Sequence, residues 1–148
     1  MKNALALTVI LTSLVGTSSE AQKPKVSAAA SIVNSGSTNT FGYKVTVYPS
    51  GKAYSQVNGK LTMAHLPSTL TGRFFRDLEA AVPVSSLAAG HGMKSASFGT
   101  STTVSYRGQQ SPDLSSPAEA KGRAISADIL EITKELKLAN LFKRSANH

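Results

Sequence analysis

The stretch "YPSGKAYSQVNGKLTM", residues 48–63, contains the dipeptide Gly-Lys twice. A phosphate-binding loop has the form G-x-x-x-x-G-K-[ST]. Its early glycine lets backbone amides converge on the phosphate, and the hydroxyl after the lysine meets Mg²⁺. Neither copy has the early glycine, because Thr46 and Tyr54 stand there, and neither has the hydroxyl, because Ala53 and Leu61 follow the lysines. Both dipeptides are therefore predicted to turn the chain rather than to hold a phosphate.

Each turn fits a three-residue hairpin loop, in which a type I turn is closed by a glycine with positive φ. Pro49 suits the first position because its φ is already fixed near the required value, and Ser50 and Asn58 suit the second position of their turns. Gly51 and Gly59 are then expected to take positive φ. The stretch is predicted to form a three-stranded antiparallel meander with a turn at each glycine.

Loop length sets the register, and the register sets which side chains share a face. Three-residue loops pair Tyr48 with Lys52 at the first turn, and Gln56 with Lys60 at the second. The apolar face then carries Tyr43, Val45, Val47, Ala53, Ser55, Leu61 and Met63. The polar face carries Lys44, Thr46, Tyr48, Lys52, Tyr54, Gln56, Lys60 and Thr62. This partition predicts a sheet with one buried face and one solvated face.

The segments around the meander supply further strands and a first helix. Residues 26–33 are expected to form a strand before it. Pro67 and Ser68 open a helix that ends at Pro83, with Leu70, Phe74, Leu78 and Ala81 along one face. Two short strands are expected at residues 94–98 and 103–108, joined around Gly99.

A second helix is predicted after residues 116–119, "SPAE", which form a capping box with proline at the first helical position. Its apolar stripe consists of Ile125, Ile129, Ile132 and Leu136, and Gly122 is expected to let it approach the sheet closely. Its charges form two flanks, typical of a solvated helix: Asp128, Glu131 and Glu135 on one, Arg123, Lys134 and Lys137 on the other. The element order predicts an α+β fold: an antiparallel sheet, made of the meander plus two later strands, with both amphipathic helices packed on one face.

The N-terminal region has the pattern of a secretory signal peptide. Lys2 is followed by an apolar run over residues 4–15 and by the small-x-small site Ser19-Glu20-Ala21. The prediction is a cleaved signal peptide at 1–21, a single domain at 22–138 and a frayed tail at 139–148, with no transmembrane segment after cleavage. The product is expected to be exported, to a periplasm or to the extracellular space. It contains no cysteine, which excludes thiol nucleophiles and thiolate metal sites.

The residue pattern does not indicate a catalytic or metal site. His65, His91 and His148 have no second histidine or carboxylate at a metal-ligand spacing, so they are predicted to be solvated, and no cofactor is expected. The serine motif G-x-S-x-G is approached only at residues 99–103, which lack the closing glycine. A hydrolase whose Ser, His and Asp are assembled in space, for instance with His91 and Asp113, stays open as an alternative.

The polar sheet face is the candidate binding site, and it consists of Lys44, Thr46, Tyr48, Lys52, Tyr54, Gln56 and Lys60. Its tyrosines suit a protein partner, while its lysines and tyrosines together suit a polyanion or nucleic acid. The net charge of +8 is compatible with an anionic partner. A protein partner is the favoured hypothesis, because an exported protein meets other proteins more often than nucleic acid.

The overall plan resembles that of emfourin-like small bacterial domains, which inhibit thermolysin-like metalloproteases. The similarity lies in the opening "NSGSTNTFGYKVTV" at 34–47, the helix "LPSTLTGRFFRDLEAA" at 66–81, the strand "VSYRG" at 104–108 and the closing amphipathic helix. This resemblance implies an α+β fold and a protease as the protein partner. It implies a binding role without catalysis.

Overall fold

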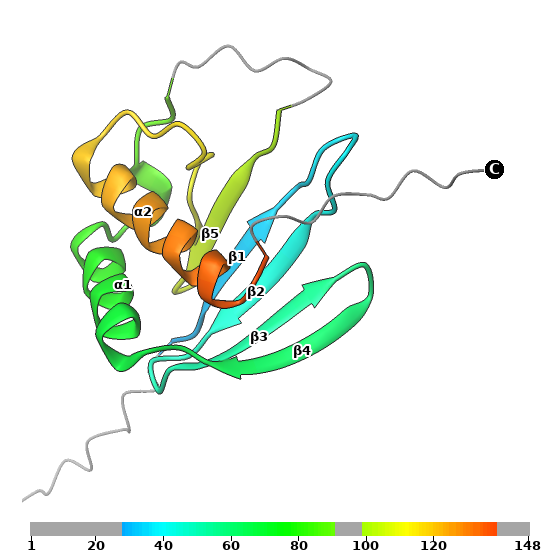
Figure 1. Ribbon diagram of the computed structural model, residues 1–148. Coiled ribbons are helices and arrows are strands. Elements are labelled where there is room, and N and C mark those ends of the chain that lie inside the picture. Colours follow the sequence, from blue (N-terminus) through cyan, green and yellow to red (C-terminus); the bar gives the residue numbers. More distant parts are fainter. Residues whose placement is uncertain (1–27, 91–98, 139–148) are drawn as a thin grey trace, which may run out of the picture.

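The computed structural model describes residues 28–90 and 99–138. It contains β1 (Ala30–Asn34), β2 (Tyr43–Val47), β3 (Lys52–Val57), β4 (Lys60–His65), α1 (Ser68–Ala80), a 3₁₀ turn (Val84–Ser86), β5 (Thr102–Tyr106), β6 (Gln109–Gln110) and α2 (Ala120–Glu135). The strands form one antiparallel sheet in the order β4-β3-β2-β1-β5-β6, and both helices lie on the same face of it (Figure 1). The predicted α+β class is confirmed.

The core lies between the helices and the inner face of the sheet. Side chains alternate between the two faces of each strand, so β1 to β3 bury every second residue. The fully buried strand residues include Ala30, Ile32, Val45, Val47, Ala53 and Val104. Phe74 and Leu78 of α1 and Ile125 and Ile132 of α2 pack against them with no exposed surface. These helix positions are the ones that the sequence periodicity predicts.

The first hairpin turn is confirmed. The amide of Tyr48 donates to the carbonyl of Lys52 at 2.9 Å, and the amide of Gly51 donates to the carbonyl of Tyr48 at 2.9 Å. Gly51 has φ = +85°, and further along the ladder Thr46 lies opposite Tyr54. The three-residue loop therefore sets the predicted register between β2 and β3.

The second hairpin turn differs from the prediction by one residue. Val57 pairs with Lys60, so the loop consists of Asn58 and Gly59 alone, with φ = +46° and +79°. These angles are those of a type I′ turn, whose twist matches the twist of the flanking strands and which Asn-Gly favours. The predicted pairing of Gln56 with Lys60 is wrong, because Gln56 lies opposite Leu61.

This shift exchanges the two faces of β4. Leu61 and Met63, predicted to lie in the core, lie opposite Gln56 and Tyr54 on the outer face. Their side chains are 64% and 53% exposed. Lys60 and Thr62, predicted for the outer face, instead lie on the face that the helices cover.

The helices occur where the sequence predicts them, but the start of α2 differs. The predicted capping box is absent: α2 begins after Glu119, whose Oε1 accepts the amide of Ala88 at 2.8 Å. Gly122 is buried as expected, yet a Cβ there would meet Pro117 at 2.9 Å rather than the sheet. The long-range contact to Ala88 thus replaces the local cap.

Of the two later strands, the one predicted at residues 103–108 corresponds to β5. It ends in a turn at Arg107 and Gly108, both with positive φ, and the short β6 follows. The strand predicted at 94–98, the signal peptide at 1–21 and the tail at 139–148 lie outside the described residues. The first strand begins at Ala30 rather than at residue 26 within the part of the chain that is described.

Candidate functional site

The sheet has one face that neither helix covers, since both helices pack on the other face (Figure 1). We call this surface the open face. It consists of the outward side chains of β1 to β5 and of the adjoining Tyr48: Ser31, Val33, Lys44, Thr46, Tyr48, Lys52, Tyr54, Gln56, Leu61, Met63, His65, Thr103 and Ser105. Six of the seven predicted site residues are brought together here. Lys60 is the exception, because the two-residue loop before β4 places its side chain on the opposite face of the sheet.

An aromatic and cationic cluster forms one end of the open face. The rings of Tyr48 and Tyr54 meet edge to face, with centroids 6.0 Å apart and planes at 77°. The Nζ atom of Lys52 lies 5.1 Å from the centroid of the Tyr54 ring. The neighbouring Tyr54 hydroxyl raises the pKa of the Lys52 ammonium above its ordinary value. The cluster presents two rigid rings and a fixed positive charge.

Leu61 and Met63 extend this cluster with apolar surface. Met63 lies directly opposite Tyr54, and Leu61 lies opposite Gln56. Two further exposed side chains, Val33 at 40% and Tyr48 at 39%, lie on the same face. Sequence reasoning missed Leu61 and Met63 as site residues, although the Asn-Gly dipeptide before β4 is the signal that reveals their orientation.

Charge is segregated between the two layers of the domain. None of the six strands contains Asp or Glu, and they contain the three lysines Lys44, Lys52 and Lys60. The acidic residues in the described part of the chain all lie on the helices or in the segment before α2: Asp77, Glu79, Asp113, Glu119, Asp128, Glu131 and Glu135. The open face therefore combines positive charge with exposed apolar and aromatic side chains.

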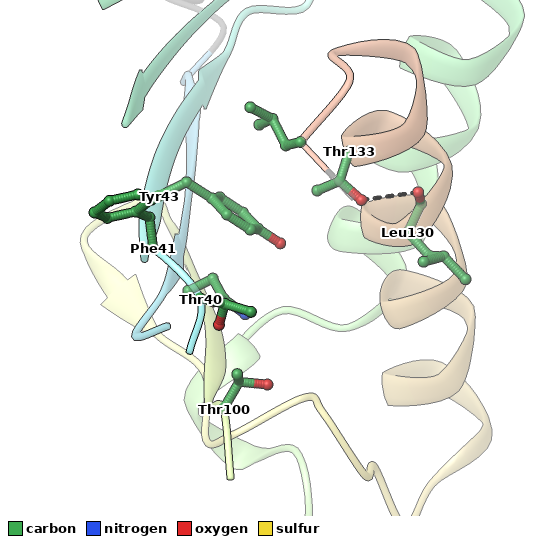
Figure 2. Close-up of a pocket in the computed structure, with 8 residues that line it drawn as sticks. Thr40, Phe41, Tyr43, Thr100, Leu130 and Thr133 are labelled. Atoms are coloured by element: carbon green, nitrogen blue, oxygen red, sulfur yellow. Dashed lines mark hydrogen bonds between the residues drawn. The ribbon is translucent and has the colours of Figure 1, made fainter. Parts of the chain in front are cut away.

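A hollow of about 230 Å³ opens on the helix side of the sheet, between one end of the central strands β1 and β2 and helix α2 (Figure 2). It is lined by Asn34, Thr40, Phe41, Tyr43, Thr100, Leu130, Thr133 and Leu138. The Tyr43 ring points across it toward α2, where the Thr133 hydroxyl donates to the Leu130 carbonyl at 2.9 Å. Burial raises the pKa of the Tyr43 phenol, and its hydrogen bond with Thr133 lowers it in part. The described residues that line the hollow carry hydroxyl, amide and apolar groups, and none of them is a carboxylate or a histidine.

The structure corrects the prediction that Asp128 is a solvated charge. Its side chain is 2% exposed, and its Oδ1 accepts the Nε of Arg73, on α1, at 2.5 Å. A second nitrogen of Arg73 donates to Glu131. Burial raises the pKa of Asp128, while Arg73 opposes that rise and the charges of Asp77 and Glu131 add to it. Asp128 joins the two helices instead of facing solvent.

Of the histidines and the aspartate singled out in the sequence, the structure describes His65 and Asp113. His65 is exposed at the end of β4. The Asp113 Oδ1 accepts the amides of Thr102 and Ser115, each at 2.9 Å. His91 and His148 lie outside the described residues. Among residues 28–90 and 99–138, no group of three or more His, Asp or Glu side chains is arranged to hold a metal ion.

Comparisons with protein-family models, with curated proteins and with solved structures found no match to this chain. Within the described residues, no helix combines the length and the apolar character needed to cross a membrane.

Proposed function

We propose that this chain is an exported, non-enzymatic domain that binds another protein through the open face of its sheet. The observation that carries the proposal is the position of Leu61 and Met63. These exposed apolar side chains adjoin Tyr54 and Lys52 on a face that lacks acidic residues. Aromatic and methionine side chains are enriched in the buried centres of protein interfaces.

The register correction favours a protein over a polyanion. A nucleic-acid site needs several cations that follow the phosphates, together with rings on which bases stack. The open face holds Lys44 and Lys52 but not Lys60, and two of the three β4 side chains on it, Leu61 and Met63, are apolar. Polyanion binding, the alternative function, would have to rely on fewer charges than the sequence predicts. A protease is the most concrete protein partner, because of the resemblance to emfourin-like inhibitors described above.

The test is a pull-down from native envelope and secreted fractions with immobilised residues 22–148, washed first with salt and then with denaturant. The proposal is supported if a protein stays bound to the wild-type domain through the salt wash and is not captured by the Leu61→Lys variant. Leu130→Lys is the matched control, because Leu130 is a comparably exposed leucine (54%) on α2 rather than on the sheet. Equal capture by both variants would contradict a role for the open face.

Two further readouts separate the alternatives. Nucleic acid or acidic polymer released in the salt step would support polyanion binding, because counterion release makes such binding fall steeply with salt. If the captured protein is a protease, stoichiometric loss of its activity on titration with the domain would support the inhibitor version. A protease that stays fully active in the complex would exclude that version.

A further inference from the structure

The two edges of the sheet differ in how their backbone groups are used. Beyond β5, the segment from β6 to Leu114 covers the edge. The amide of Ser111 donates to the carbonyl of Val104 at 2.8 Å, and the amide of Leu114 donates to the carbonyl of Thr102 at 2.7 Å. The amides of Val104 and Thr102 donate to the side chains of Ser111 and Asp113. This edge is closed to further pairing.

The β4 edge is open in the part of the chain that the structure describes, where β4 pairs with β3 alone. Just past the end of β4, the amide of Leu66 donates to the carbonyl of Gly51 at 2.8 Å. In an antiparallel pair the backbone groups of successive residues point alternately toward and away from the partner strand. Even-numbered residues therefore point to β3, and the backbone groups of Leu61, Met63 and His65 point outward.

The sequence of β4 has one feature that can block edge pairing, the charge of Lys60 on the helix side of the sheet, and lacks the others. Natural edges are protected by proline, by bulges, by inward charges or by very short strands. Residues 60–65, "KLTMAH", contain no proline and pair with β3 without interruption, and the lysine stands at the first position. An uncovered edge of this kind is a template for another strand.

The side chains on the two faces of β4 indicate what that strand contains. On the open face it would lie beside Leu61 and Met63, which favour apolar side chains. On the helix side it would lie beside Lys60 and Thr62, at a hollow of about 340 Å³ that Val57 and Leu136 also line. Since none of the six described strands carries an acidic residue, Lys60 has no carboxylate in them to pair with.

We propose that β4 accepts an extended segment of the partner as a seventh strand, and that this segment alternates apolar with acidic side chains. The proposal rests on the proposed function and adds its mode of recognition, strand addition, in which backbone hydrogen bonds supply affinity and alternate side chains supply specificity. A second copy of this chain is a poorer occupant, because its β4 would bring another lysine and no acidic residue to the edge.

The test uses a fluorescein-labelled octapeptide of alternating valine and glutamate, with binding to residues 22–148 followed by fluorescence anisotropy. Met63→Pro removes an outward N–H and leaves the hydrogen bonds to β3, while Met63→Ala removes the same side chain and keeps the N–H. Met63→Pro is expected to bind at least about fivefold more weakly than Met63→Ala. Circular dichroism would confirm that both variants keep the wild-type fold.

Charge is tested separately, so that the proposal stays falsifiable if Met63→Pro does not fold. Lys60→Glu is expected to weaken binding of the valine-glutamate peptide and to improve binding of a valine-lysine peptide, because one charge contact changes sign. Lys134→Glu, with the same charge change on α2, is the matched control and should leave both affinities unchanged. A serine-glutamate peptide, which lacks the apolar side chains, should bind more weakly than the valine-glutamate peptide to the wild type.

Equal affinities for the valine-glutamate and serine-glutamate peptides would overturn the proposal, as would equal loss in Met63→Pro and Met63→Ala. Sedimentation that shows a wild-type dimer abolished by Met63→Pro would assign the edge to a second copy and also overturn it. These failures are distinguishable from failure of the proposed function. A captured protein that still depends on Leu61, but is insensitive to Met63→Pro relative to Met63→Ala, would dock on the open face without adding a strand.

Discussion

Replacing Leu61 and Met63 together by alanine is expected to change the free energy of unfolding only slightly. Their side chains are 64% and 53% exposed, so about a third of the first and about half of the second is buried. Full burial of such a side chain contributes about 1.5–3 kcal/mol. Because alanine keeps part of the buried area, the double variant should lose about 1 kcal/mol.

The register predicted from a three-residue second loop gives a very different magnitude. Leu61 and Met63 would then lie in the core, where truncation of such a residue to alanine costs about 2–5 kcal/mol. The pair would remove much of the 5–15 kcal/mol by which a domain is typically stable. The two registers therefore differ by several kcal/mol in one measurement.

The assay is urea denaturation of residues 22–148 followed by far-ultraviolet circular dichroism. The slope of the unfolding free energy against urea concentration is compared between variants, to confirm that unfolding exposes the same surface area in each. Ile32→Ala is the positive control, because Ile32 is fully buried in β1 and its truncation should cost about 2–5 kcal/mol. A loss of about 4 kcal/mol or more in the Leu61 and Met63 double variant would refute the type I′ register. The open face as defined here would then lose its apolar part.

Three further predictions concern the helices and the first turn. Burial raises the pKa of Asp128 above its value in the unfolded chain, so the native state binds this proton more tightly. The stability of the wild type relative to Asp128→Asn should therefore rise as pH falls from 7 toward 4, and denaturant melts at several pH values that show the opposite slope would contradict this. Gly72→Ala in α1, where a Cβ meets nothing within 4 Å, should raise stability by about 0.5–1 kcal/mol. Gly51→Ala, at φ = +85°, should lower stability by about 1–2 kcal/mol, and thermal melts showing equal effects of the two glycine replacements would refute the assigned backbone conformation.

Much of the fold follows from local patterns. The spacing of Leu70, Phe74 and Leu78 predicts α1 and the face that it buries, because residues three and four apart share one side of a helix. The order of strands and helices predicts the α+β class. Six of the seven candidate site residues also follow from the alternation along β2 and β3.

The register of β4 was encoded locally but depended on a choice between two turn types. Asn58 and Gly59 are compatible both with the end of a three-residue loop and with a complete type I′ turn. A difference of one residue in loop length moved Leu61, Met63 and Lys60 to the opposite faces. The functional hypothesis changed with it, from a lysine-rich face toward an apolar and aromatic one.

The sequence by itself determined the turns, the helical stripes and the alternation of the strands, because these depend on backbone preferences and spacings within a few residues. Only the tertiary structure decided which charges are buried and which edge of the sheet is open. Asp128 is taken from solvent by Arg73, which lies 55 residues earlier, and Glu119 binds an amide 31 residues away instead of capping its helix. The β5 edge is closed by a segment that folds back on it, while β4 has no such neighbour among the described residues. Such partners are set by the packing of distant segments, which local periodicity does not record.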